Sequence, residues 1–121
     1  MKMLDQTGAQ GEISFRRVPG GPDFLTGGTR IDPKDGRFII GHSETGHHHV
    51  VRQGGVDLME MPAPSRGIRL LRMIVSDPLV QLEHEREFDQ HEPWGFQPGY
   101  YEFRIGREYD PYERIARQQA D

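Results

Sequence analysis

The chain has 121 residues, of which 34% are hydrophobic, and 15 basic against 19 acidic residues give a formal net charge of −4. A chain of this size encloses one core, so we predict a single domain over residues 1–121, with residues 1–10 and 112–121 at its periphery. The acidic balance provides no broad basic field, which argues against nucleic acid and anionic membranes as partners. The sequence contains no cysteine, so any metal site must use nitrogen and oxygen ligands.

Short apolar runs separated by Gly and Pro dominate the chain from residue 11 onward. Alternating or branched apolar residues predict strands over residues 11–18, 37–41, 47–53, 55–62, 68–76, 79–85 and 99–110. Residues 19–36 and 86–99 are predicted to be long loops, the first with Phe24 and Leu25 packed toward the core. Since no predicted helix exceeds ten residues, we expect an all-β fold, a small antiparallel sandwich or barrel with long Gly/Pro-rich loops.

Four of the six histidines fall within G-H-S-E-T-G-H-H-H-V, residues 41–50. If Ser-Glu-Thr-Gly forms a four-residue hairpin connection, His42 and His47 lie opposite each other and share one face of the sheet. Side chains alternate along a strand, so His49 lies on that face and His48 on the other. Cross-strand Cβ separations of roughly 4.5–5.5 Å suit imidazole nitrogens that must approach one ion to about 2.0–2.1 Å.

A second histidine cluster lies in E-H-E-R-E-F-D-Q-H-E-P, residues 83–93, where carboxylates surround His84 and His91. If this loop closes over the hairpin, both histidines join the coordination sphere of a divalent ion. Neutral imidazole with oxygen and no sulfur suits zinc, iron, manganese or nickel. Glu44 and Glu85 are the candidate catalytic acids or bases beside such an ion. The alternative is a histidine cluster that is only exposed or hydrogen-bonded.

Two other features admit simpler interpretations. The Gly20-Gly21 and Gly27-Gly28 pairs match no established phosphate-binding motif, and we interpret them as loop glycines. Trp94 lies between proline and glycine in an irregular segment, where it lines a pocket or covers a neighbouring subunit.

The chain resembles a set of small bacterial and phage-encoded β-rich proteins in a pattern that spans most of its length. The shared motifs are Q-G-E at residues 10–12, G-H-x-E-T-G-H-x-H at residues 41–49, an H-E stretch with a later His at residues 84–91, P-G-x-Y at residues 98–101 and R-E-Y at residues 107–109. The resemblance implies a β-rich fold and transfers no activity.

A fainter resemblance links His47-x-His49 and Glu60 to the first metal motif of the cupins, which are jelly rolls. The second cupin motif is not reproduced, because Pro98 and Gly99 are contiguous and no histidine follows them.

These observations predict a small soluble β domain that binds a divalent metal ion through histidines, with metal-activated water as the chemistry it could support; its substrate, a small molecule, is not identified. The rival prediction is a structural or assembly protein, such as a phage particle component or a homo-oligomeric subunit, with the histidines at an interface. No segment approaches the roughly 20 apolar residues of a membrane span, and residues 1–12 lack a signal-peptide run. We therefore expect a cytoplasmic homo-oligomer, or a virion protein if the chain is phage-encoded.

Overall fold

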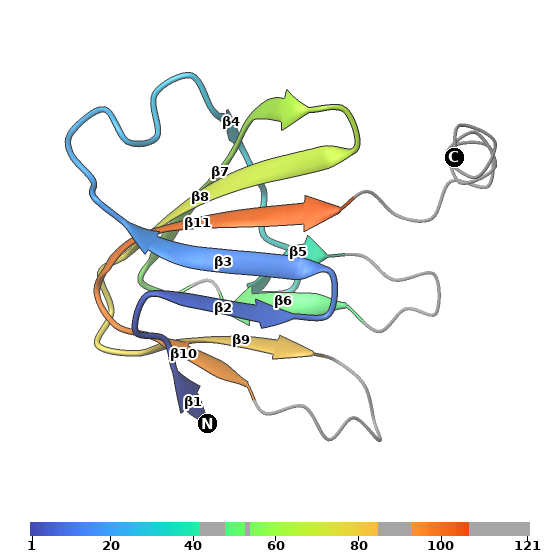
Figure 1. Ribbon diagram of the computed structural model, residues 1–121. Helices are drawn as coiled ribbons and strands as arrows, with labels where there is room; N and C mark the ends of the chain where they lie inside the picture. Colours follow the sequence, from blue (N-terminus) through green and yellow to red (C-terminus); the bar gives the residue numbers. More distant parts are fainter. Residues whose placement is uncertain (42–47, 53, 85–92, 107–121) are drawn as a thin grey trace, which may run out of the picture.

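The computed structural model describes residues 1–41, 48–52, 54–84 and 93–106, and within them every helix or strand element is a β-strand. The strands form two sheets that pack face to face as a sandwich (Figure 1). The first sheet has the order β2-β3-β11-β8-β7-β4 and contains β2 (Thr7–Gln10), β3 (Ile13–Val18), β4 (Thr29–Arg30), β7 (Val56–Ser65), β8 (Ile68–Val75) and β11 (Gly99–Gly106). The second has the order β1-β10-β9-β6-β5 and contains β1 (Lys2–Met3), β5 (Arg37–Gly41), β6 (His49–Arg52), β9 (Val80–His84) and β10 (Trp94–Phe96).

The six-stranded sheet is antiparallel throughout, and β11 is at its centre between β3 and β8. Glu102 on β11 lies opposite Arg16 on β3 and Arg72 on β8. In the five-stranded sheet only the short β1 runs parallel to its neighbour, β10. The all-β sandwich expected from the sequence is therefore confirmed.

The core fills the space between the two sheets. Alternate residues of the longer strands point inward because side chains alternate across a strand, and this gives the buried sets on β3, β8 and β11. Aromatic rings join the layers: Phe96 of the five-stranded sheet contacts Phe103 and Tyr101 of the other at centroid separations of 5.7 and 5.0 Å. The core cluster comprises Leu4, Ile13, Phe15, Phe38, Ile40, Val51, Leu58, Leu71, Met73, Val75, Val80, Leu82, Phe96, Tyr101, Phe103 and Ile105.

Several local predictions were wrong. Residues 1–10, for which the sequence predicted no strand and a peripheral place, contribute β1 and β2 and bury Leu4. The strand expected to end at residue 62 continues to Ser65, with its two prolines inside a register shift between Met61 and Ser65. A bulge tolerates proline because the lost N–H is not needed in the ladder.

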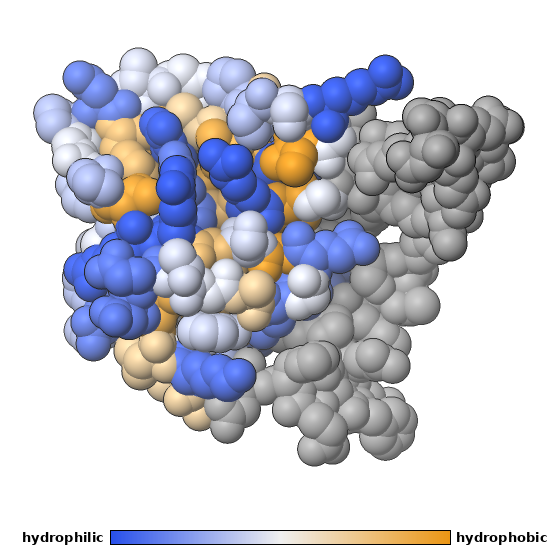
Figure 2. Space-filling view, in the orientation of Figure 1, coloured by the Kyte–Doolittle hydropathy of each residue, from blue (hydrophilic) through white to orange (hydrophobic). Residues whose placement is uncertain are grey.

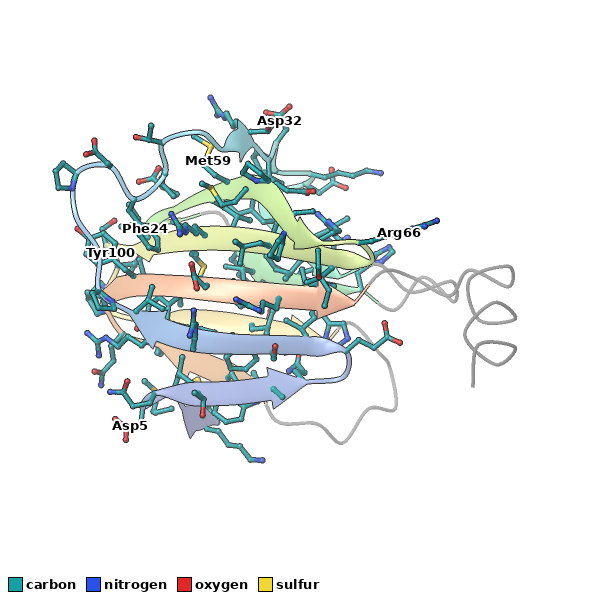
Figure 3. All side chains as sticks on the ribbon, turned by 45° about the horizontal axis from the view of Figure 1, so that its top comes forward. Asp5, Phe24, Asp32, Met59, Arg66 and Tyr100 are labelled. Carbon is teal, nitrogen blue, oxygen red and sulfur yellow. The ribbon has the colours of Figure 1, made fainter. Side chains whose placement is uncertain are left out.

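Two residues of the predicted loops also pack differently from the prediction. Phe24 is buried, but against Tyr100 on the outer face of the six-stranded sheet and not in the central core (Figure 3). Trp94 belongs to a short strand, β10, and its ring contacts Phe15 of the opposite sheet at 5.2 Å, so it packs inward. No helix in the described part of the chain is long and apolar enough to cross a membrane.

Candidate functional site

His49 and His84 lie at one end of the sandwich, which we call the histidine end and define by Gln10, Gly41, His49 and His84. Strands β2, β5 and β9 finish there and β6 begins there, as the arrowheads at the right of Figure 1 show. In the backbone register His49 lies directly opposite His84 across β6 and β9. On its other side, His49 lies opposite Gly41 of β5.

A buried glutamine fixes the imidazole of His49. Gln10, only 5% exposed, lies on the six-stranded sheet, and its Oε1 is 2.7 Å from Nδ1 of His49 on the five-stranded sheet. The amide nitrogen of Gln10 donates to the carbonyl oxygen of Leu82 at 3.5 Å. This second bond turns Oε1 toward the imidazole, so Nδ1 of His49 carries the proton and donates it. In the neutral ring the lone pair is then on Nε2, the atom that a metal ion would take.

Two glycines make room for this ring. A Cβ added to Gly11 would lie 3.1 Å from Nε2 of His49, and Gly11 also has a φ of 60°, which favours glycine. A Cβ added to Gly41 would lie 3.5 Å from Cδ2 of His49 and 2.9 Å from Cδ1 of Ile13. The half-buried imidazole is therefore held against the turn between β2 and β3, with its Nε2 edge toward Gly11.

The structure describes only part of the predicted ligand set. His42, His47, His91, Glu44 and Glu85 lie outside the described residues. For His84 the backbone is described, in β9, and for His49 both backbone and side chain. Among the described residues there is no group of three or more His, Asp or Glu placed to hold a metal ion.

The predicted hairpin between residues 37–41 and 47–53 exists, but its register differs from the prediction. A four-residue connection with His42 opposite His47 requires Gly41 opposite His48, whereas the structure pairs Gly41 with His49 after a bulge between Ile39 and Gly41. A bulge adds a residue to one strand and shifts every later pairing by one.

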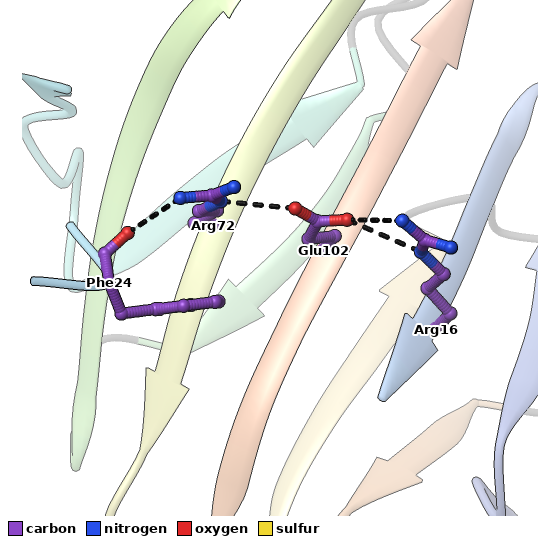
Figure 4. A network of polar contacts seen from close by, with 4 residues as sticks. All are labelled: Arg16, Phe24, Arg72 and Glu102. Carbon is purple, nitrogen blue, oxygen red and sulfur yellow. Dashed lines mark hydrogen bonds and ion pairs between the residues drawn. The ribbon is translucent and has the colours of Figure 1, made fainter. Parts of the chain in front are cut away.

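A second polar cluster, missed by the sequence analysis, lies on the outer face of the six-stranded sheet. The carboxylate of Glu102 accepts bonds from Nε and Nη2 of Arg16 at 3.2 and 2.8 Å and from Nε of Arg72 at 3.0 Å (Figure 4). Nη1 of Arg72 also donates to the carbonyl oxygen of Phe24 at 3.1 Å. We call Arg16, Glu102 and Arg72 the arginine bridge.

Two opposing effects act on the pKa of Glu102. Burial raises this pKa, because it disfavours the charged form, but the hydrogen bonds and positive charges of Arg16 and Arg72 outweigh burial and leave the pKa below its usual value of 4.5. Glu102 is therefore ionised at neutral pH and fixes both guanidiniums. Sequence separation hides this arrangement, because the partners are 86 and 30 residues apart.

Comparison with known proteins gives a family and no activity. The model of a family described as a domain of unknown function, DUF8820, matches residues 9–106, most of the chain. The chain belongs to the DUF8820 family. No curated protein and no solved structure matches it. The matched region of this DUF8820 domain contains Gln10, His49 and His84 as well as the arginine bridge.

Proposed function

We propose that this DUF8820 domain binds a divalent first-row metal ion at the histidine end, with His49 and His84 as two of its ligands. The observation that carries the proposal is their direct opposition across β6 and β9. Opposed residues of antiparallel strands share a face, with Cβ atoms roughly 4.5–5.5 Å apart, a spacing that two imidazoles of one coordination sphere can span.

The bond between Gln10 and His49 supports this proposal. Histidines that bind metal usually donate their second ring N–H to an oxygen acceptor, which fixes the tautomer and the ring orientation. Oε1 of Gln10 is such an acceptor, placed by its own bond to Leu82. A surface histidine without a binding role would not need a buried hydrogen-bond partner from the opposite sheet.

The remaining ligands are proposed from the sequence. His42, His47 and His91 are the candidates to complete the sphere, with zinc, iron, manganese or nickel as the ion. Such an ion supplies activation of a bound water molecule or polarisation of a substrate oxygen. Glu44 and Glu85 are the candidate acids or bases for that chemistry.

Thermal denaturation with and without added Zn²⁺ tests the proposal. An ion at 100 times its Kd that binds only the folded state stabilises it by about 2.7 kcal/mol. We expect Zn²⁺ to raise the Tm of the wild-type chain, and EDTA to reverse the rise. His49→Ala and His84→Ala should each abolish the rise, whereas His48→Ala, the matched control from the same histidine run, should keep it. An equal rise in all four proteins, or none in the wild type, would refute the proposal.

A second proposal, a homo-oligomeric subunit, has its own support. Met1, Met3 and Leu79 are 50%, 43% and 40% exposed and are the exposed large hydrophobic residues of the described chain. They gather over Gly95, where an added Cβ would lie 2.6 Å from the sulfur of Met3 and 3.2 Å from Cδ1 of Leu79. Covering an apolar patch favours association. Light scattering after size exclusion should give a multiple of the chain mass for the wild type. The double variant Met3→Lys, Leu79→Lys should have a lower mass, because the apolar patch is lost. A monomeric wild type would contradict the proposed oligomer.

A further inference from the structure

A cleft of about 540 Å³ opens beside the arginine bridge on the outer face of the six-stranded sheet, next to the loop that follows β3. Its lining includes Arg16, Arg72, Glu102, Gly20, Gly21 and Asp23. The loop that follows β3 forms one wall, on the left of Figure 1. Figure 2 shows the outer face of the six-stranded sheet, where rows of hydrophilic side chains alternate with apolar ones.

The guanidiniums of Arg16 and Arg72 are held in place before any ligand arrives. Glu102 binds both, and Phe24 accepts from Arg72 on its far side (Figure 4). Each guanidinium has five N–H donors, more than these bonds use. Because one carboxylate serves two arginines, the bridge carries one net positive charge; Arg17 and Asp23, which also line the cleft, offset each other.

The loop wall is also fixed. A Cβ added to Gly20 would lie 2.1 Å from ring atoms of Tyr100, so the backbone at Gly20 sits directly on that ring. The ring of Phe24 packs edge-on against Tyr100 at a centroid separation of 5.0 Å (Figure 3). The guanidinium of Arg72 lies over the Phe24 ring, also at 5.0 Å. In contrast, a Cβ at Gly21 would meet no atom within 4 Å. A ligand can therefore approach the backbone at Gly21 without displacing the wall.

We propose that this cleft binds an oxyanion, the phosphate or carboxylate group of a small acidic molecule. Guanidinium N–H groups in a fixed fork match the oxygens of both groups, and their preorganisation lowers the entropy lost on binding. The assignment of an oxyanion rests on the arginine bridge. It does not rest on the adjacent Gly20-Gly21 pair, which matches no phosphate-binding motif. The site is independent of the proposed metal site.

Inorganic phosphate is the probe, titrated into ¹⁵N-labelled full-length protein at constant ionic strength with chloride as the reference anion. We expect saturable shifts of the amide signals of Gly20, Gly21 and Asp23 and of the Nε–H signals of Arg16 and Arg72, with a Kd in the millimolar range. Arg16→Gln should raise that Kd about tenfold or more, because a charge-assisted hydrogen bond is lost.

Arg66→Gln is the matched control. Arg66 is exposed in the turn between β7 and β8, on the side of the molecule away from Phe24 and Tyr100 (Figure 3), and its loss changes the net charge equally without touching the cleft. It should leave the Kd within about twofold, since exposed charges act weakly at a distance in salt. Gly21→Asp should also weaken binding, by placing a carboxylate in the cleft while leaving both arginines. Equal weakening by Arg16→Gln and Arg66→Gln, shifts that map elsewhere, or no saturation would overturn the proposal.

Discussion

Gln10→Leu removes the side chain that joins the two sheets at the histidine end. It leaves Nδ1 of His49 without its 2.7 Å acceptor in a site where Gln10 is 5% exposed. A buried polar group that loses its partner costs about 1–3 kcal/mol, and the longer 3.5 Å contact with Leu82 adds little. We therefore expect a loss of about 2 kcal/mol in the free energy of unfolding, or a Tm lower by about 6–10 °C for a domain of this size.

Urea unfolding in EDTA measures this loss apart from any metal effect. Gln10→Glu keeps an oxygen acceptor for His49, so it should retain the affinity for Zn²⁺. Gln10→Leu should lower the affinity for Zn²⁺ about 10–100-fold, as is usual when the acceptor behind a metal-binding histidine is removed. Gln81→Leu makes the same chemical change at a half-buried position on β9 and serves as the control. If Gln10→Leu and Gln81→Leu matched each other in both stability and affinity, the role assigned to Gln10 would be wrong.

Three further predictions concern the sheets. The pKa of Glu102 is lower in the folded chain than its usual 4.5, so the ionised carboxylate stabilises the folded state above pH 4.5, and this stabilisation is lost as pH falls through the folded pKa. In Glu102→Gln the free energy of unfolding should therefore depend less on pH below pH 4.5. Urea titration at each pH measures this dependence. Gly20→Ala, which forces a Cβ into an aromatic ring, should lower the Tm, while Gly21→Ala, in open space, should not. Phe96→Ala at a fully buried site should cost about 3–5 kcal/mol in chemical denaturation, against about 0.5 kcal/mol or less for Leu79→Ala at the surface.

The sequence predicted the long central strands well. β8 and β11 carry branched or alternating apolar residues, and their periodicity follows directly from burial of one face. β10 could not be predicted in this way, because three residues that include Gly95 show no period. Its extended form comes from pairing with β9 and β1, which are distant in the sequence.

The strands that carry the candidate site were predicted in part. The pairing of residues 37–41 with the strand after the turn is confirmed, and placing residues 79–85 in a strand was a necessary step toward the pairing of His49 with His84. That pairing itself is a contact between separate hairpins, which local spacing does not encode. Gln10 gave no signal, because a glutamine in a short polar segment is ordinarily exposed. Only the fold shows it buried beside His49.

Metal content tests the central claim most directly. The full-length protein, expressed without added metal and purified without a nickel column, would be analysed by inductively coupled plasma mass spectrometry together with a His49→Ala, His84→Ala double variant and His48→Ala. The account predicts close to one first-row divalent metal per chain in the wild type and in His48→Ala, and almost none in the double variant. A metal-free wild type that also takes up no zinc on dialysis, or equal metal in all three proteins, would contradict it.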